Sequence, residues 1–299
     1  MTSQTPHTPV LLHETIEGLN LQPGGVVIDA TVGAGGHALA MSSAVGPSGL
    51  VIGFDADTEA LELATKKLTT GPAKFMLIKS NFRSMKTELA TRGINEVDAI
   101  LFDLGVSSMQ LDKAGRGFSF RFDAPLVMTL DSTPTPEALT AMDLINTLAA
   151  DELAVILKTY GEESFALRIA EAIEKSRSEG PIETTGQLVA IIEQAVPFWY
   201  KKRKIHPATK TFQALRIAVN DELGALTEGL NEAWSLLKTG GRLGVISFHG
   251  LETKIVKDFI KDKKKTGQAS KVVKVKPSRP EILANHRSRS AILRLVSKM

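Results

Sequence analysis

A carboxylate directly precedes a glycine-rich turn near the start of the chain. Asp29 follows the apolar run 26–28 and opens the sequence Asp-Ala-Thr-Val-Gly-Ala-Gly-Gly-His, which ends at His37. Glycines let the backbone turn sharply and approach a ligand closely, because no Cβ intervenes. In open α/β sheets, a strand, a glycine turn and a helix bind nucleotides in this way. A carboxylate here would repel a phosphate and attract a cation, so the turn favours a ligand with a positive end.

A second carboxylate lies where a nucleotide ribose would be recognised. Asp55 ends another apolar run about 20 residues after the glycines, and an acidic residue there can accept hydrogen bonds from both ribose hydroxyls. Nicotinamide enzymes and methyltransferases that use S-adenosylmethionine share this feature, and the glycines alone match only the loose dinucleotide pattern. Asp55 could instead cap the helix that follows, a role for which Asp57 competes.

A third carboxylate, Asp103, ends the apolar run 97–102 and opens the sequence Asp-Leu-Gly-Val-Ser-Ser. We expect its strand to lie beside the first strand, at the topological switch point of the sheet. Methyltransferases that act on amino groups hold the target nitrogen after this strand, which favours a methyltransferase over a nicotinamide enzyme. Asp103 could orient a target amine or bind the amino group of the cofactor, and we favour the cofactor role. The backbone carbonyls of residues 104–107 are the other candidate acceptors for the amine.

Alternating strands and helices must position these three carboxylates. The apolar runs at 26–30, 50–55, 75–79 and 97–103 predict buried strands, and the spacing at 38–44, 58–68 and 82–90 predicts helices between them. Strands that alternate with helices form βαβ units with a parallel sheet, so the predicted fold class is α/β.

The alternation stops after the third carboxylate and resumes later. Residues 112–136 are rich in Gly, Pro, Asp and Arg, and residues 136–197 show helical stripes without a convincing strand. A helix is then expected over 211–237, ended by the sequence Lys-Thr-Gly-Gly at 238–241, followed by a strand at 242–248 and a helix at 252–261. Segments 272–275 and 291–296 could pair as a final hairpin. We therefore predict one α/β domain, formed by residues 1–108 and 210–299, that is split by an all-helical insertion at 109–209.

Composition indicates a globular protein with an uneven distribution of charge. The 299 residues are 43% hydrophobic and 23% charged, with no apolar run long enough for a membrane helix and no secretory signal at the start, so we expect a cytoplasmic protein. The net charge is only +3, yet residues 257–299 hold 13 Lys and Arg against 3 Asp and Glu. Such asymmetry suggests a polyanionic partner, although a solvated basic surface would look the same.

Two properties of the chain limit its chemistry further. It contains no cysteine, which excludes thiolate metal sites and cysteine nucleophiles, and its six histidines do not cluster, so no metal site is expected. The segment 198–206 interleaves aromatic and cationic residues, which suits RNA phosphates and base stacking. Its aromatic residues could instead be buried at the junction between the insertion and the α/β domain.

Several long motifs in one order resemble those of the bacterial ribosomal small-subunit methyltransferase H family. The resemblance spans nearly the whole chain, and the motifs are HTPVLL at 7–12, DATVGAGGH at 29–37, DLGVSSMQLD at 103–112, RGFSFR at 116–121, HPATKTFQALR at 206–216, VISFH at 245–249 and RSRSA at 287–291. The chain departs from the family pattern at Val127, Thr129, Gly250, Thr253 and His286. An acidic residue is usual at the position of Thr253.

The resemblance implies a Rossmann-like methyltransferase with an inserted helical domain. It implies N4-methylation of a single cytidine in the decoding region of 16S rRNA, within the small ribosomal subunit, with S-adenosylmethionine as donor. The cofactor would be held by residues of the glycine turn, by the ends of the next strands and by nearby residues, namely Asp29, Gly33, Gly35, Gly36, His37, Asp55, Phe82, Asp103 and Gln110. In this assignment Asp55 holds the ribose, Phe82 lies near the adenine, and Asp103 and Gln110 lie near the methionine end.

The basic segments supply the RNA contacts that the resemblance and the charge distribution suggest. The candidates are Arg116, Arg121, Lys202, Arg203, His206, Lys210, Arg287 and Arg289. Methylation at N4 also agrees with the absence of cysteine, because the known route to C5 of cytosine adds a cysteine thiolate to the ring.

Three other functions fit parts of this sequence. One is a methyltransferase for another rRNA base or for a protein, which mapping the modified residue would separate. Another is a non-catalytic RNA-binding assembly factor, which binding of S-adenosylmethionine would argue against. The third is a nicotinamide oxidoreductase, which failure to bind the nicotinamide cofactor would remove.

Overall fold

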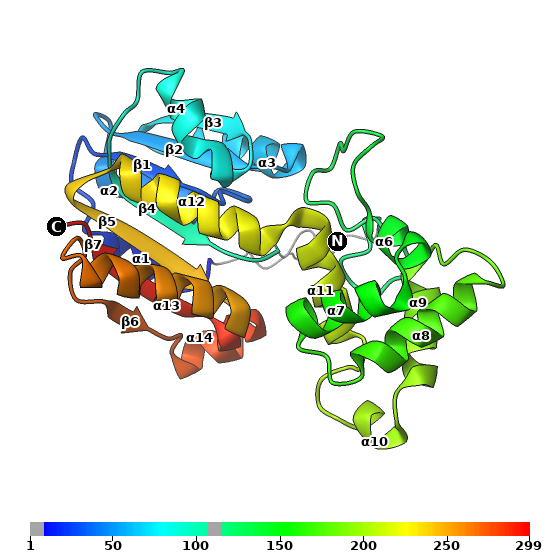
Figure 1. The fold of residues 1–299 in the computed structure, drawn as a ribbon. Helices are drawn as coiled ribbons and strands as arrows, with labels where there is room; N and C mark the ends of the chain where they lie inside the picture. The colour runs from blue at the N-terminus through cyan, green and yellow to red at the C-terminus, as the bar shows by residue number, and fades with distance from the viewer. Residues whose placement is uncertain (1–8, 107–114) are drawn as a thin grey trace. The chain divides into compact units, whose positions relative to one another are not determined.

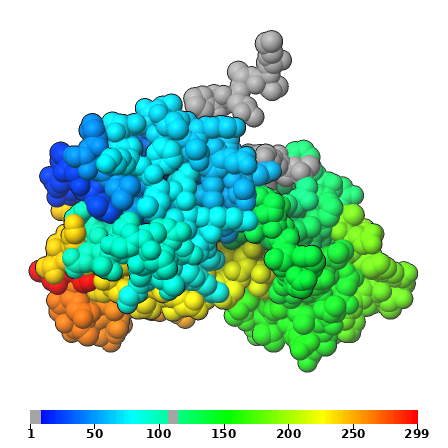
Figure 2. All heavy atoms as spheres, turned by 90° about the horizontal axis from the view of Figure 1, so that it is seen from above, coloured from blue at the N-terminus to red at the C-terminus, as the bar shows by residue number. Residues whose placement is uncertain are grey.

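The structure, a computed structural model, describes residues 9–106 and 115–299. The chain forms two compact units, one made by Met1–Gly105 together with Leu223–Met299 and the other by Val106–Glu222. The first unit, here called the sheet unit, therefore comes from two separate parts of the sequence. In the space-filling view its yellow-to-red residues lie directly against its blue and cyan residues (Figure 2).

A seven-stranded sheet organises the sheet unit, with the strand order β3-β2-β1-β4-β5-β7-β6 (Figure 1). The strands are β1 (Val26–Asp29), β2 (Leu50–Asp55), β3 (Lys74–Lys79), β4 (Val97–Asp103), β5 (Leu237–Ser247), β6 (Val273–Val275) and β7 (Ile292–Ser297). Strands β1 to β5 run parallel, whereas β7 is antiparallel to both β5 and β6. The predicted α/β class, the placement of β4 beside β1 and the final hairpin are all confirmed.

Helices cover both faces of this sheet. One face packs against η1 (Phe82–Ser84), α4 (Met85–Ala90), α12 (Glu222–Leu236) and α13 (Gly250–Lys265). The other packs against α1 (Leu12–Leu19), α2 (Gly36–Val45) and α3 (Thr58–Leu68). The short helices α14 (Arg279–Ala284) and η2 (His286–Ser290) link β6 to β7. Because both faces are covered, the strands β1, β2 and β4 are almost continuously buried, which explains why they read as apolar runs rather than as alternating patterns.

The structure corrects the prediction of one helix over 211–237. That region is two helices, α11 (Thr209–Asn220) and α12, which are separated by Asp221 in the left-handed region at φ 45°. The predicted stop at 238–241 is instead the beginning of β5, where the register against β4 shifts between Val97 and Ala99. The glycines at 240 and 241 therefore mark an irregular strand and not a helix end.

The second unit, here called the helical unit, contains α6 (Ala141–Thr147), α7 (Ala150–Gly161), α8 (Ala166–Arg177), α9 (Thr185–Ala195), α10 (Phe198–Lys201) and α11. Its apolar stripes form a separate core that includes Leu157, Ile169, Leu188 and Leu215. Hydroxyl caps begin two of the helices, since Thr140 and Thr184 accept hydrogen bonds from backbone N–H groups in the first turns of α6 and α9. Helix α11 packs on α7, so the helical unit continues to Glu222 rather than stopping at residue 209.

No helix in the described part of the chain is both long enough and apolar enough to cross a membrane.

Candidate functional site

Three carboxylates come together at one edge of the sheet. Asp29, Asp55 and Asp103 are the last residues of β1, β2 and β4, which are adjacent and parallel. Because parallel strands end at the same edge, the fold itself gathers these side chains, here called the carboxylate cluster. This is the crevice in which open α/β sheets bind their ligands.

The electrostatics of the carboxylate cluster favour a cationic ligand. Burial raises the pKa of Asp29 to about 7, and the neighbouring charge of Asp55 adds to the rise. Burial also raises the pKa of Asp55 to about 6. For Asp103, burial and then the charges of Asp29 and Glu252 raise the pKa to about 8. All three groups resist ionisation because they are buried and lie close to other carboxylates, and a bound cation would favour their ionised forms.

Asp29 shapes the turn from within. Its residue is 1% exposed, and its Oδ1 accepts the N–H of Thr31 at 3.2 Å. The hydroxyl of Thr31 in turn accepts the N–H of Asp103 at 2.7 Å, which joins the ends of β1 and β4. Asp29 therefore contributes a hydrogen bond that shapes the loop.

Two glycines of the turn are required by packing against the protein. Gly35 has φ 77°, and a Cβ on it would lie 3.1 Å from the Cα of Ala64 in α3. A Cβ on Gly36 would lie 2.4 Å from Cγ of Pro9. These positions let α2 begin close to its neighbours. Near the third glycine, Gly33, the only atom of the described residues within 4 Å of the Cβ position is the Thr31 carbonyl oxygen at 3.9 Å, so this part of the chain leaves space there.

Asp55 holds the glycine turn and keeps acceptor capacity. Its Oδ2 accepts the N–H of Gly33 at 2.9 Å, and its Oδ1 accepts the N–H of Asp57 at 2.9 Å. Each carboxylate oxygen can accept a further bond, so a diol could still be bound. The cap of α3 is Asp57, whose carboxylate accepts the N–H of Glu59 at 3.1 Å. The alternative role of Asp55 as a helix cap is therefore taken by its neighbour.

Asp103 has an acceptor atom that fits an amine or ammonium group. Its Oδ1 is buried and accepts no hydrogen bond from any residue that the structure describes. Its Oδ2 lies 4.0 Å from Nε2 of His37, a residue that is 4% exposed at the start of α2. A buried carboxylate oxygen without a donor is costly, and an N–H group of a ligand would supply the missing bond.

The remaining predicted cofactor residues differ in what the structure shows. Phe82 contacts Phe102 edge to face, with ring centroids 5.3 Å apart, and a Cβ on Gly229 of α12 would lie 2.5 Å from its ring. It is therefore a partly buried core contact as well as a residue near the carboxyl end of β3. Gln110 lies outside the described residues.

Sequence reasoning missed Thr31 and Glu252. Glu252 is 3% exposed in the first turn of α13 and accepts the N–H groups of Phe248 and His249 at 2.7 and 3.3 Å. A signal was present, because Glu252 comes three residues after His249, the N-cap of α13, which is the usual position in a capping box. Thr31 gave no such signal, because its bond to the end of β4 depends on tertiary contact.

Three RNA candidates of the helical unit bind their own chain. Arg116 donates to the carbonyl of Leu130 at 2.8 Å, and Lys210 donates to the carbonyl of Glu162 at 2.6 Å. His206 stacks on the ring of Phe120 at 4.5 Å, accepts the N–H of Ala208 at 3.2 Å and has Nε2 3.4 Å from Glu193. The exposed candidates are Arg121, Lys202, Arg203 and Arg289, whereas Arg287 is half-buried.

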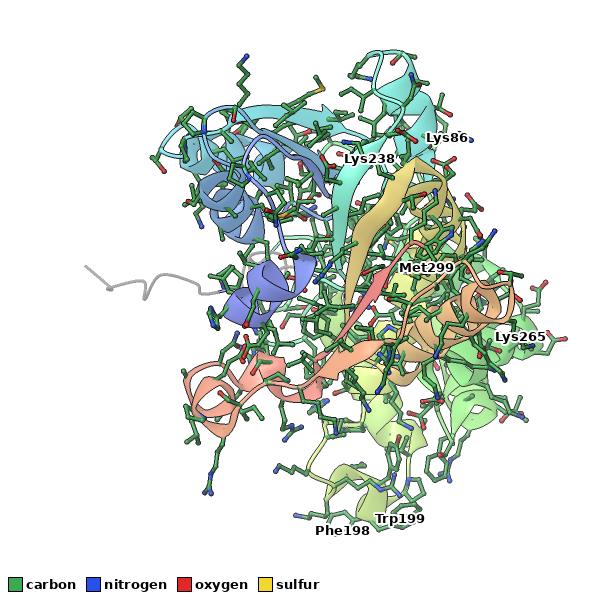
Figure 3. All side chains as sticks on the ribbon, turned by 90° about the vertical axis from the view of Figure 1, so that its left-hand side faces the viewer. Lys86, Phe198, Trp199, Lys238, Lys265 and Met299 are labelled. Atoms are coloured by element: carbon green, nitrogen blue, oxygen red, sulfur yellow. The ribbon has the colours of Figure 1, made fainter. Side chains whose placement is uncertain are left out.

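The short helix α10 displays aromatic rings and cations together. Phe198 and Trp199 are 71% and 55% exposed and project outward (Figure 3), whereas Tyr200 is buried with its hydroxyl on Glu163 at 2.8 Å. Lys202 lies 5.0 Å above the Phe198 ring, and Arg203 lies 4.8 Å from the ring centroids of Trp199 and Tyr200. The expectation of buried aromatic residues thus holds only for Tyr200. We call Phe198, Trp199, Lys202 and Arg203 the α10 tip.

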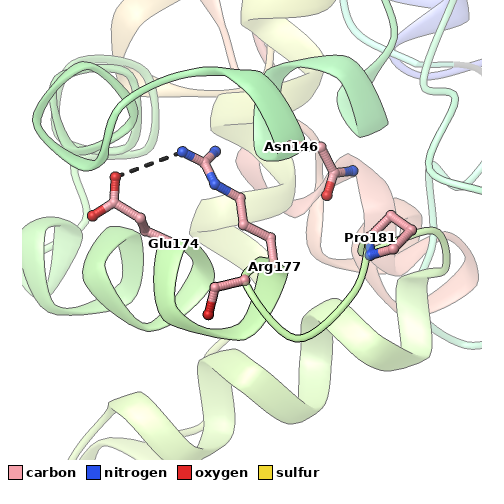
Figure 4. A pocket seen from close by; sticks show the side chains of 5 residues that line it. Asn146, Glu174, Arg177 and Pro181 are labelled. Atoms are coloured by element: carbon pink, nitrogen blue, oxygen red, sulfur yellow. Dashed lines mark ion pairs between the residues drawn. The ribbon is translucent and has the colours of Figure 1, made fainter.

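Cavities in the helical unit differ in their chemistry. One of about 510 Å³ is lined by Asn146, Glu174, Arg177, Ser178 and Pro181 (Figure 4). Its Arg177 donates to the Ile145 carbonyl at 2.6 Å, and Asn146 exchanges hydrogen bonds with the backbone of Ile182, so these groups hold the fold. A smaller one of about 190 Å³ lies beside the α10 tip and is lined by Tyr200, Arg203, Lys204, Ile205, His206 and Lys210.

Comparison with known proteins identifies the family of the chain. Over 310 residues, covering 98% of both chains, the protein is 46% identical to ribosomal RNA small subunit methyltransferase H of Syntrophotalea carbinolica. It is 52% identical to the protein of the same name from Geobacter sulfurreducens, over 85% of this chain and 81% of that one. A Streptococcus mutans structure solved in complex with SAH covers 98% of this chain and 100% of its own, with 13% identity and a TM-score of 0.48. The MraW methylase family matches residues 4–299, and the chain accordingly belongs to this family of S-adenosylmethionine-dependent methyltransferases.

Proposed function

We propose that this protein methylates N4 of a single cytidine of 16S rRNA, cytosine 1402 in bacterial numbering, within the small ribosomal subunit. The observation that carries the proposal is Asp103, whose buried Oδ1 has no donor among the described residues and which ends the strand at the switch point. Relatives named as ribosomal RNA small subunit methyltransferases support the class of substrate.

S-adenosylmethionine supplies an electrophilic methyl group when it is bound. The chain contributes the groups that hold and orient it. Asp55 has spare acceptor capacity for the two ribose hydroxyls, at the end of β2. Asp103, and Asp29 behind it, offer negative charge to the ammonium end and to the positive sulfur. Gly33 leaves the space through which a ligand can approach the backbone.

The target amine must be activated by groups other than those that bind the cofactor. The lone pair of N4 is delocalised into the cytosine ring, so the amine must be oriented and its developing positive charge accepted. Asp103 and the backbone carbonyls that follow it are the acceptors in this part of the chain, and we assign Asp103 to the cofactor. The chain has no cysteine for the covalent route to C5.

Contacts to RNA are assigned to the exposed cations and to the α10 tip. Arg121, Lys202, Arg203 and Arg289 are exposed and can meet phosphates. The Trp199 and Phe198 rings can stack on unpaired bases, since aromatic side chains bind single-stranded RNA in this way. Arg116, His206 and Lys210 already hold the helical unit together, and we assign them the support of this surface.

Methyl transfer from labelled S-adenosylmethionine to small subunits that lack the modification tests the proposal. The expected result is one labelled nucleotide, which mass spectrometry of nuclease fragments maps and which digestion releases as N4-methylcytidine. Label on another base, on C5 or on a ribosomal protein would show that the substrate is not N4 of this cytidine. Absence of both cofactor binding and transfer would favour a non-catalytic assembly factor.

A further inference from the structure

A buried arginine in β7 lacks an acidic partner. Arg294 is 5% exposed, and among the described residues its side chain donates one hydrogen bond, from Nη1 to the hydroxyl of Ser247 at 3.3 Å. Within residues 9–106 and 115–299, no Asp or Glu forms a hydrogen bond or ion pair with it. Burial lowers the pKa of Arg294, as expected for a buried cation without an acidic partner.

A second cation lies directly opposite it. Lys274 of β6 pairs with Arg294 in the antiparallel register, so both side chains leave the sheet on the same face. Like charges directly opposite each other destabilise a strand pair. The Oγ of Ser247 also lies 2.9 Å from Oγ1 of Thr253 in α13 and 3.4 Å from the carbonyl oxygen of Ile292, so the described polar groups linked to this position are uncharged.

This arrangement calls for an anion from outside the sheet unit. A guanidinium stays protonated under all ordinary conditions, and a buried charge without a partner is strongly unfavourable. The surrounding segment 257–299 has 13 Lys and Arg against 3 Asp and Glu, so the local sequence offers few internal counter-charges. A phosphate group matches the site, because arginine binds phosphate oxygens in a two-pronged geometry and the partly exposed Thr253 hydroxyl can donate to a further oxygen, while the buried Ser247 hydroxyl holds both groups in place.

We propose that Arg294, Lys274, Ser247 and Thr253 form a phosphate-binding site. The phosphate in the functioning protein is a backbone phosphate of the substrate rRNA, and this second part rests on the proposed function. The phosphate chemistry itself does not depend on it, so the two parts can fail separately.

The variant Thr253→Asp tests the site by supplying the missing charge internally. Thr253 and Arg294 contact the same Ser247 hydroxyl, so a carboxylate at 253 would reach the guanidinium. The probe is inorganic phosphate, compared with sodium chloride at equal ionic strength. We expect phosphate to raise the Tm of the wild-type protein by about 2 °C or more, and Thr253→Asp to lose this response.

Two further variants keep the test decisive. Lys254→Gln lowers the net charge by the same single unit on the exposed side of α13 and should keep the phosphate response. Arg294→Met keeps much of the side-chain length, should fold because it removes an unpaired buried charge, and should lose the response. A wild-type Tm that is the same in phosphate and in chloride would overturn the site, as would an unchanged response in Arg294→Met.

Small subunits then decide the source of the phosphate. If it belongs to rRNA, Thr253→Asp should raise KM for small subunits about 5-fold or more and reduce the salt dependence of binding by about one phosphate contact. Its Kd for S-adenosylmethionine should stay unchanged. A lost phosphate response with an unchanged KM would reject rRNA as the source. If no rRNA is methylated at all, the proposed function fails, while the Tm comparison still judges the site.

Discussion

The carboxylate cluster and the α10 tip suit different kinds of ligand. The carboxylate cluster is built from the ends of three buried strands, and its groups are pushed toward their neutral forms before any ligand arrives. The α10 tip is a four-residue helix whose aromatic rings and cations face solvent. A rigid buried site suits one small ligand of fixed shape, whereas an exposed stacking surface suits a long polyanion whose bases vary. Variants of each region should therefore affect different substrates.

The largest effect is expected for Asp103→Asn. Removing the charge while keeping the shape should weaken S-adenosylmethionine binding by about 100-fold, because a charge-assisted bond in a buried site is lost. Methyl transfer to small subunits should fall below detection, and Asp103→Ala should do the same. Calorimetric titration and labelled transfer measure these effects. Near-wild-type turnover would exclude Asp103 from both cofactor binding and amine orientation.

A control on the same strand separates charge from folding. Asp98 lies near the other end of β4, where it accepts the N–H of Val26 and pairs with Lys238. Asp98→Asn should leave cofactor affinity unchanged.

A smaller effect, about 10- to 50-fold on cofactor affinity, is expected for Asp55→Ala. The variant loses the proposed ribose acceptor and the support of Gly33. A cofactor analogue without the ribose hydroxyls should bind the wild-type protein weakly and Asp55→Ala no worse, because the interaction is already missing. Asp57→Ala, which removes the α3 cap but keeps the Asp55 carboxylate, should still discriminate between the two ligands. Discrimination that survives in Asp55→Ala would assign the ribose to another group.

At the α10 tip, Trp199→Ala should raise KM for small subunits about 5- to 50-fold, since stacking contributes about 1–3 kcal/mol for each base. The Kd for S-adenosylmethionine should not change. Val155→Ala in α7 removes another exposed apolar side chain, 63% exposed, and should leave KM as it is. If Trp199→Ala changed cofactor affinity instead, the contrast between the two regions would be lost.

The smallest effect is a pH-dependent change in stability. The folded-state pKa of Asp103, about 8, lies above its value in the unfolded chain, so the folded protein holds a proton that the unfolded chain has released. This contribution to stability is complete at low pH and is lost as pH rises toward 8. Asp103→Asn avoids the loss, so its Tm advantage over the wild type, in the absence of cofactor, should grow by a few degrees between pH 5 and about 8.5. Parallel Tm profiles would contradict the raised pKa.

Much of the carboxylate cluster could be predicted from sequence because its geometry follows from chain direction. Asp29, Asp55 and Asp103 each end an apolar run, and parallel strands must bring such ends together. What could not be predicted depends on contacts distant in sequence. The bond from Asp103 to Thr31 and the burial of Glu252 arise only after the strands and α13 are assembled.

Local patterns also misled where tertiary structure overrides them. The glycines at 240 and 241 resemble a helix stop, yet they lie within β5, between its residues Leu237 and Arg242 that pair with β4. The apolar spacing of α11 and α12 is continuous, and only the left-handed Asp221 divides it. Gly35 and Gly36 suggested ligand contact, but their immediate neighbours are Ala64 and Pro9. In each case the structure depends on a backbone angle or on a residue that is distant in sequence, and a local sequence pattern contains neither.

Because the sheet unit is formed by two separate parts of the sequence, it cannot fold completely until the end of the chain has been synthesised. Strands β1 to β4 emerge early, but the sheet is completed only after β5 and β7 have been synthesised. The hydrogen bond from the N–H of Leu11 to the carboxylate of Glu281 likewise forms only after residue 281 has emerged. The helical unit is continuous in sequence and has its own core, so it can fold while it is being synthesised. Until β5 emerges, the edge of β4 is open and can pair wrongly with another chain.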